Sequence, residues 1–289
     1  MEIKVLAPAK INLTLEILGK RDDGYHNVNT IMQTLDLYDV VTLTDNDSKK
    51  ITVSCNYEGV PCDERNICVK SALGFFEYCN LENTGIHIDI NKKIPTQAGL
   101  AGGSSDGAAV MIALDKMFNT NLNLSQMGKI CEKVGADVPF CLSGGTMLAT
   151  GIGTTLTKVP KFCCENIVVC KPDNVSVSTA EAYGKVDSLS AHISYTDKML
   201  TALKNADENE IISSIFNDFD VALQIPQVNE IKSVLQKYNA KGTLMSGSGS
   251  AVYGIFSSFA DAEACYNRLK ADYKEVFLCK TINHGCIIL

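Results

Sequence analysis

The start of the chain alternates strictly between apolar and polar residues, the two-residue period of a β-strand with two distinct faces. For a strand over residues 9–17, the apolar face would hold Ala9, Ile11, Leu13, Leu15 and Ile17, and the polar face Lys10, Asn12, Thr14 and Glu16. Similar patterns predict further strands over 3–7, 25–37, 40–44, 51–55 and 86–90. We therefore expect the first third of the chain to be rich in strands.

A helical period begins directly after a proline-led, glycine-rich segment, residues 94–107. Ser104 or Ser105 stands where a helix N-cap belongs, since its hydroxyl oxygen can accept a hydrogen bond from a free backbone N–H. From Ser105 onward, one helical face is formed by Val110, Met111, Leu114, Met117 and Phe118. The segment therefore predicts a loop that leads straight into a capped helix.

Two more helices are expected in this half, over 67–79 and 125–134. Asn66 would cap the first, and its inward residues would be Val69, Leu73 and Phe76. Beyond residue 160 the patterns predict strands at 167–170, 242–245, 251–256 and 276–281, and helices at 178–186, 196–205, 208–216, 228–238 and 260–273. Together these elements predict an α+β fold of two domains, residues 1–160 and 161–289.

The composition of the 289 residues is that of an ordinary globular protein, with 46% hydrophobic and 20% charged residues. A net charge of -7 argues against a nucleic-acid or membrane surface as partner, but leaves room for a local basic pocket. We expect a cytoplasmic protein, because neither a signal peptide nor a membrane-length apolar run is seen, and the 12 scattered cysteines form no C-x-x-C pair.

The glycine-rich segment is the strongest candidate for chemistry. Backbone N–H groups of such a loop, at the positive end of a helix dipole, suit a phosphate. It lacks the Gly-Lys-Ser/Thr ending of a Walker loop, and it could also be an ordinary loop before a capped helix. Residues 103–107 match G-x-S-x-G, so a serine hydrolase using Ser105 with His192 or His284 is a rival hypothesis.

Lys10 and Asp137 are candidates for a catalytic pair. A carboxylate can accept the proton of an attacking hydroxyl, while an ammonium lowers the pKa of that hydroxyl and offsets phosphate charge. Each residue also has a plain structural interpretation: Lys10 as a solvated surface lysine, and Asp137 as the N-cap of a short helix that begins at Val138-Pro139.

Two further segments carry candidate binding residues. Tyr25 and His26 follow a charged turn and could stack on and hydrogen-bond a heterocycle, or could be a sheet-edge tyrosine beside a surface histidine. Residues 247–249, Gly-Ser-Gly, lie between two expected strands. They could form a plain hairpin turn or a second wall of a phosphate pocket.

Taken together, these motifs resemble those of the GHMP small-molecule kinases. The shared motifs are the glycine-serine loop at 95–106 and the loop at 245–249. Residues 7–13, the Gly-Tyr-His at 24–26 and the segment 135–140 resemble more closely the members that phosphorylate a cytidyl derivative of methylerythritol in non-mevalonate isoprenoid synthesis. The similarity spans nearly the whole chain. Homoserine kinase is the alternative within the family, and a catalytically silent binding relative is another.

The resemblance implies two α/β domains with the active site in the cleft between them, and a kinase that uses ATP and Mg²⁺ on a small-molecule substrate. Lys10 and Asp137 would act on the 2-hydroxyl, with Asp137 as general base. The cytidyl substrate would contact Asn12, Tyr25, His26 and Tyr183. ATP would contact Pro95, Gly99, Leu100, Ala101, Gly102, Gly103, Ser104, Ser105, Gly247 and Ser248. No protein ligand to magnesium is expected, and the oligomeric state, monomer or homodimer, stays open.

The sequence departs from the family pattern at Ala101, where relatives usually carry glycine, and at Thr150 and Thr154, where they often carry acidic residues. An alanine is tolerated at position 101 unless the backbone there needs a positive φ.

Overall fold

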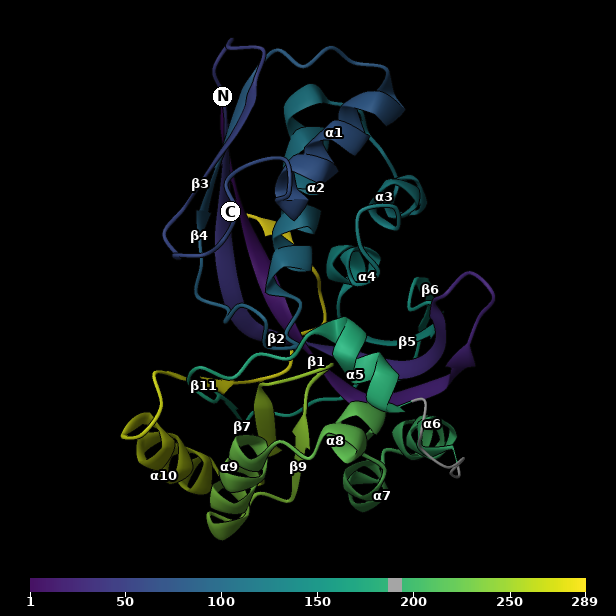
Figure 1. Ribbon diagram of the computed structural model, residues 1–289, viewed down its shortest axis with the longest axis vertical. Coiled ribbons are helices and arrows are strands. Elements are labelled where there is room, and N and C mark those ends of the chain that lie inside the picture. Colours follow the sequence, from purple (N-terminus) through teal and green to yellow (C-terminus); the bar gives the residue numbers. More distant parts are fainter. Residues whose placement is uncertain (187–193) are drawn as a thin grey trace.

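The computed structural model describes residues 1–186 and 194–289. Its strands form one eight-stranded and one four-stranded sheet (Figure 1). The first sheet is built on an antiparallel pair of very long strands, β1 (Glu2–Lys20) and β2 (His26–Asp45). The strands expected over 3–7 and 9–17 are both part of β1, because its pairing with β2 continues through small register shifts such as the one between Pro8 and Lys10.

The same correction holds for β2, which joins the two strands expected over 25–37 and 40–44 into one. The strands expected near 51–55 and 86–90 are confirmed as β3 (Ile51–Cys55) and β4 (Ile86–Asn91). They extend the sheet beyond β2 in the order β12-β1-β2-β4-β3.

The remaining strands of the first sheet are short. β5 (Thr146–Gly151) pairs with β2, and β6 (Thr155–Lys158) pairs with β5. β8 (Phe216–Asn217) and β12 (Ile287–Ile288) both pair with β1. The sequence pattern did not predict β6, β8 or β12, since two to four residues are too few to show a period.

Four helices cover one face of the upper part of this sheet (Figure 1): α1 (Ile67–Cys79), α2 (Gly102–Phe118), α3 (Leu124–Cys131) and α4 (Val138–Ser143). The face of α2 expected to be apolar packs into the core, with Val110, Met111 and Leu114 fully buried. This face fixes the rotation of α2, and with it the direction in which the residues of its first turn point.

The prediction for α1 is right at its start and wrong at one inward position. The Asn66 side chain accepts a hydrogen bond from the backbone N–H of Cys68, as a helix N-cap does. Leu73, however, is 52% exposed, while Ala72 is fully buried. The buried face follows the i, i+3, i+7 series from Val69, and Leu73 at i+4 falls outside it.

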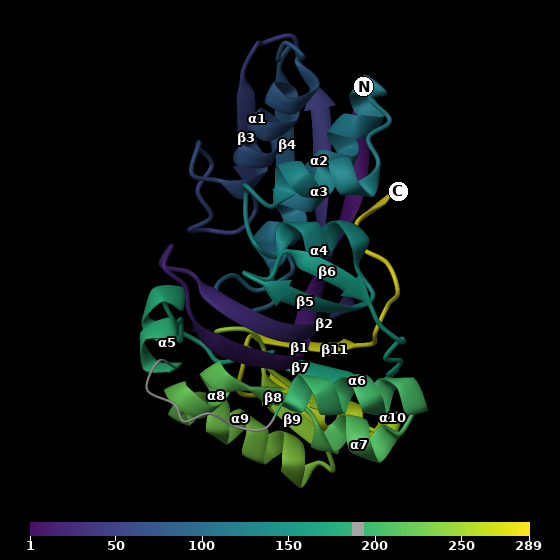
Figure 2. The same cartoon turned by 90° about the vertical axis from the view of Figure 1, so that its right-hand side faces the viewer.

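The second sheet has the order β11-β7-β10-β9 and is antiparallel throughout. Its strands are β7 (Ile167–Lys171), β9 (Gly242–Met245), β10 (Val252–Ile255) and β11 (Glu275–Cys279). One face packs against the lower half of β1, where Ile11 and Leu13 meet Val169 and Tyr253. The opposite face packs against helices at the bottom of Figure 2.

The helices that follow residue 160 are α5 (Thr179–Val186), α6 (Tyr195–Asn205), α7 (Glu208–Ser213), α8 (Asp218–Leu223), α9 (Pro226–Lys237) and α10 (Phe259–Lys270). All except α8 lie near predicted helices. No helix in the described ranges is both long and apolar enough to cross a membrane. The domain boundary near residue 160 stays a prediction. Two strands that follow this boundary in the sequence, β8 and β12, pair with β1 in the first sheet.

Candidate active site

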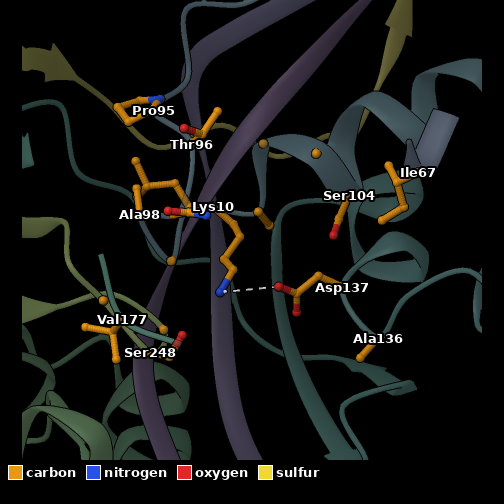
Figure 3. A pocket seen from close by; sticks show the side chains of 18 of the residues that line it. Lys10, Ile67, Pro95, Thr96, Ala98, Ser104, Ala136, Asp137, Val177 and Ser248 are labelled. Carbon is orange, nitrogen blue, oxygen red and sulfur yellow. Dashed lines mark ion pairs between the residues drawn. The ribbon is translucent and has the colours of Figure 1, made fainter. Parts of the chain in front are cut away.

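A cavity of about 940 Å³ opens where the upper helices, the two long strands and the second sheet meet (Figure 3). The glycine-rich loop before α2 forms one wall, and residues 247–249 form another. Lys10 of β1 and Asp137 before α4 face each other across the middle. The size is near the upper end of the usual range for small-molecule sites, so two ligands of moderate size can be accommodated.

Lys10 is not a surface lysine. Its residue is only 4% exposed, because the polar face of β1 is turned into the molecule and not toward solvent. Lys10 Nζ donates a hydrogen bond of 2.7 Å to Asn12 Oδ1 and lies 3.7 Å from Asp137 Oδ2. A buried ammonium without such partners would be costly, so this position is built to hold a positive charge.

Asp137 occupies the N-cap position of α4 but its carboxylate makes no capping hydrogen bond. A proline in the first turn of α4 reduces the need for a cap, because proline has no N–H to satisfy. The side chain of Asp137 is 37% exposed and points into the cavity toward Lys10 (Figure 3). The interpretation of Asp137 as a mere helix cap is therefore wrong, and its oxygens are accessible to a ligand.

Asn12 links the lysine to the loop at 247–249. Its Oδ1 accepts hydrogen bonds from Lys10 Nζ and, at 3.0 Å, from the backbone N–H of Gly247. Its Nδ2 donates to Thr30 Oγ1 at 2.8 Å. Because the amide of Asn12 is occupied by these three partners, it holds Lys10 and the loop in fixed positions relative to each other.

The glycine-rich loop enters α2 three residues earlier than expected. The helix begins at Gly102, and its N-cap is Ala101, which makes no side-chain capping bond. The expected cap at Ser104 or Ser105 is therefore wrong, since both lie inside the first turn. Ala101 has φ +56°, the left-handed conformation that glycine adopts most easily and the condition under which an alanine is strained.

The two glycine loops are in direct contact. A Cβ added to Gly99 would lie 1.9 Å from the carbonyl oxygen of Ser246, so only glycine fits there. The Ser246 hydroxyl donates to the carbonyl oxygen of Gly99 at 2.9 Å, and the backbone N–H of Ala251 donates to Ala98. The loops thus form one continuous wall of the cavity.

The segment at 247–249 is both a hairpin connection and a cavity wall. It joins the antiparallel strands β9 and β10, and all three of its residues line the cavity. Asn217 is buried behind it, and its Nδ2 donates to the carbonyl oxygens of Met245 and Gly247, each at 2.8 Å. The two interpretations of this loop therefore hold together.

Of the ten residues expected at ATP, nine line the cavity: Pro95, Gly99, Leu100, Ala101, Gly102, Gly103, Ser104, Gly247 and Ser248. Ser105 does not. It is fully buried, with its hydroxyl 3.7 Å from Cys286 Sγ, because the helix rotation that buries Val110 also turns Ser105 toward the core. The same burial removes the basis of the hydrolase hypothesis. Of its proposed partners, His284 donates from Nδ1 to the backbone carbonyl oxygen of Gly285, and His192 lies outside the described residues.

The aromatic residues expected at the substrate are only partly in the cavity. Tyr183 of α5 lines it, with Phe219 edge-on at 5.0 Å. His26 stacks directly on Tyr183 at 4.4 Å between ring centroids, the distance of one stacked pair, so no base fits between these two rings. Tyr25 is 62% exposed and is not among the lining residues.

The sequence analysis missed a buried charge cluster below the glycine loop. Lys92 Nζ pairs with Asp39 and, at 2.8 Å, with Asp106 Oδ2, and all three side chains are almost fully buried. Lys92 and Asp106 line the cavity. The sequence did contain a signal for this cluster. Asp39 stands at an apolar-face position of β2, and Asp106 stands at an apolar-face position of α2. Arg65 and Asn66, at the start of α1, also line this end.

The chain matches two family models, "GHMP kinases N terminal domain" over residues 66–145 and "GHMP kinases C terminal" over residues 199–275. Curated relatives named 4-diphosphocytidyl-2-C-methyl-D-erythritol kinase include those of Caldicellulosiruptor saccharolyticus and Thermoanaerobacter pseudethanolicus. Both are 42% identical, over 95% and 98% of both chains, respectively.

Solved structures give the same grouping. A crystal structure of 4-(cytidine 5'-diphospho)-2C-methyl-D-erythritol kinase superposes with a TM-score of 0.79 at 28% identity, over 97% of this chain and 99% of that one. A homoserine kinase from Cytophaga hutchinsonii has the same TM-score at 20% identity, over 100% and 97%, and shares the fold. The chain belongs to the GHMP kinases, and within them to the branch of the 4-diphosphocytidyl-2-C-methyl-D-erythritol kinases.

Proposed function

We propose that the protein transfers the γ-phosphoryl group of ATP to the 2-hydroxyl of 4-diphosphocytidyl-2-C-methyl-D-erythritol, giving the 2-phosphate and ADP. The observation that carries the proposal is the pairing of Lys10 with Asp137 at 3.7 Å, opposite the glycine-rich loop and inside one cavity. The names of the 42% identical relatives supply the acceptor.

Asp137 is the general base in this proposal. Its carboxylate reaches the cavity without a capping bond, so it can accept the proton of the 2-hydroxyl as that oxygen attacks the phosphorus. Lys10 stabilises the negative charge that develops on the attacking oxygen and on the transferred group. Asn12 keeps the ammonium of Lys10 in place, and in this role it positions the lysine more than it contacts substrate.

ATP binds along the wall formed by the two glycine loops. The free backbone N–H groups at the start of α2 and the positive end of its dipole favour the phosphates, and the Ser104 hydroxyl is an additional donor on the same wall. Backbone donors are already positioned before the phosphates arrive, so little reorganisation is needed on binding.

Magnesium enters as the ATP complex. Mg²⁺ commonly binds through substrate phosphates and water with few protein ligands. We therefore assign the ion to the phosphates. When bound there, it would neutralise part of the phosphate charge.

The cytidyl part of the acceptor binds at the end of the cavity near α5 and α8. Val177, Tyr183 and Phe219 give this end an apolar and aromatic wall. Because His26 already stacks on the far face of Tyr183, the cytosine would use the cavity face of Tyr183. His26 then supports that ring, and Tyr25 reaches the base only if the exposed turn before β2 closes over it.

We also propose the division into domains 1–160 and 161–289, since the two family models lie on either side of residue 160. A cytoplasmic location is supported by the twelve cysteines, all of which are free thiols. The net charge of -7 supports a small-molecule substrate over nucleic acid.

The test is ADP release from MgATP with each of three acceptors: the cytidyl substrate, homoserine and mevalonate. We expect release with the cytidyl substrate alone, and its loss in Asp137→Asn. ADP release with homoserine would be consistent with the fold and the catalytic pair. It would overturn the assignment of the cavity end near α5 and α8 to the cytidyl group. Unchanged turnover in Asp137→Asn would overturn the general base.

A further inference from the structure

One buried carboxylate on the cavity wall has an oxygen without a partner. Asp106 lies in α2, and its side chain is only 4% exposed. Oδ2 accepts a hydrogen bond of 2.8 Å from Lys92, but Oδ1 has no hydrogen-bond partner among the described residues. A buried polar atom left unsatisfied costs about 1–3 kcal/mol, so this oxygen requires an explanation. Asp106 is one of the residues that line the cavity, next to the glycine loop.

The second carboxylate of the cluster is fully satisfied. Asp39 Oδ1 accepts from the backbone N–H groups of Lys93 and Ile94, at 2.6 and 2.8 Å, and its Oδ2 pairs with Lys92. Three donors stabilise the ionised form of Asp39, whereas Asp106 has one. If either carboxylate takes up a proton, it is therefore Asp106, and the proton belongs on Oδ1.

When Asp106 is ionised, the cluster carries one excess negative charge, because two carboxylates share one ammonium. The other titratable groups that face Asp106 are the thiols of Cys55 in β3, Cys68 in α1 and Cys286 just before β12. Burial raises the pKa of all three thiols, which keeps them neutral. Arg65, on the same cavity wall, is already paired with Asp63 at 2.7 Å. The excess charge would repel a triphosphate.

We propose that Asp106 binds the nucleotide as a neutral carboxylic acid. As the nucleotide enters, Oδ1 takes up one proton from solvent, and the resulting O–H donates a hydrogen bond to an oxygen of the nucleotide. This removes the excess charge and satisfies the unpartnered atom in one step. The inference rests on the proposed function only in that the cavity binds ATP.

The electrostatics support this assignment. Burial raises the pKa of Asp106 well above its usual range, and the charge and hydrogen-bonding proximity of Asp39 raise it further, while Lys92 only partly offsets these effects. Binding that requires the protonated form then weakens as the pH rises through this raised pKa.

Proton uptake can be measured directly by calorimetry of a non-hydrolysable MgATP analogue, without acceptor, in two buffers of different ionisation enthalpy. For the wild type we expect a fractional uptake of protons per nucleotide that increases as the pH rises through the pKa of Asp106. In Asp106→Asn, which is neutral and of equal shape, uptake vanishes and affinity no longer depends on pH. The difference between the two proteins cancels any proton bound by the nucleotide itself.

Asp115→Asn is the matched control, because Asp115 lies in the same helix but not at the cavity. It should take up protons as the wild type does. Nucleotide binding without an Asp106-dependent proton would overturn the inference alone. So would a selective loss of affinity for 2'-deoxy nucleotides with no uptake, since Asp106 would then be an ionised acceptor for a ribose hydroxyl. Absence of all nucleotide binding would overturn the proposed function as well.

Discussion

Lys10 and Asp137 face each other at 3.7 Å, although one belongs to a strand of the first sheet and the other to the start of a short helix. Their environments are unequal: the side chain of Lys10 is 4% exposed and that of Asp137 is 37% exposed. The lysine is therefore fixed by the protein interior, while the carboxylate remains accessible to a substrate. This asymmetry fits a fixed charge and a proton acceptor.

Replacing the proton acceptor should affect turnover and not nucleotide binding. In Asp137→Asn we expect kcat to fall by about 10²–10⁴, the usual contribution of a general base, while the affinity for ATP changes little. Steady-state ADP release and equilibrium nucleotide binding check the two parts separately. The exposed Asp22→Asn is a suitable control and should leave both unchanged.

Ala101 is a site where a glycine should stabilise the protein. A non-glycine residue at φ +56° destabilises the folded state by about 1–2 kcal/mol. Glycine removes this strain, but its greater conformational entropy in the unfolded chain cancels part of the gain. Ala101→Gly should therefore raise the free energy of unfolding by about 0.5–1 kcal/mol, as measured by urea denaturation.

The same change elsewhere in α2 should have the opposite sign. Ala109 is fully buried in the helix interior, where glycine costs about 1 kcal/mol in propensity and leaves a small cavity in addition. If Ala101→Gly and Ala109→Gly were equally destabilising, the strain assigned to Ala101 would be wrong.

Asn217 should matter for catalysis although it does not line the cavity. Asn217→Asp keeps the oxygen that caps α8 but replaces two donors, to Met245 O and Gly247 O, by a carboxylate facing two carbonyl oxygens. We expect at least about a tenfold fall in kcat/KM and a loss of about 2–4 kcal/mol in stability. Asn123→Asp is the control, since Asn123 is an exposed residue that caps α3 through its side-chain oxygen, which aspartate retains. A variant as active as wild type would show that the loop at 247–249 holds its shape unaided.

Alkaline pH should destabilise the fold through its buried thiols. Burial raises the pKa of Cys131 and of Cys286 to about 12, from a usual value near 9. Between these values the unfolded chain loses protons that the folded chain keeps, so stability falls as the pH rises through 9 toward 12. Each thiol should cost about 1 kcal/mol between pH 9 and pH 10.

Urea denaturation under reducing conditions at the two pH values measures this effect. Cys131→Ala should lose less stability over that interval than the wild type, whatever its stability at pH 7. The outcome that would contradict the prediction is an identical pH dependence in both proteins.

The sequence predicted those features that depend on local period and failed for those that depend on distant neighbours. The alternation in β1 identified Lys10 and Asn12 as neighbours on one face. Whether that face is wet or buried depends on α4 and the second sheet, which a local pattern does not contain.

The same limit explains the missed charge cluster. Asp39 and Asp106 stand at apolar-face positions of β2 and α2, but no local pattern shows that Lys92, from the segment after β4, lies between them. Their burial becomes visible only when the three elements are packed together. The helices that contain Leu73 and Ser105 were predicted correctly. The rotation of each helix about its own axis was not, and it leaves Leu73 exposed and Ser105 buried.

The pairing of β12 with β1 has a consequence for how the protein is made. Val5 and Ile288 are partners in the sheet, so one border of the strand that carries Lys10 is left uncovered until residues near the far end of the numbering have been synthesised. An open strand border is a template for unwanted pairing with another chain. During synthesis the first half of the chain therefore passes through a period in which this strand border needs protection from other chains.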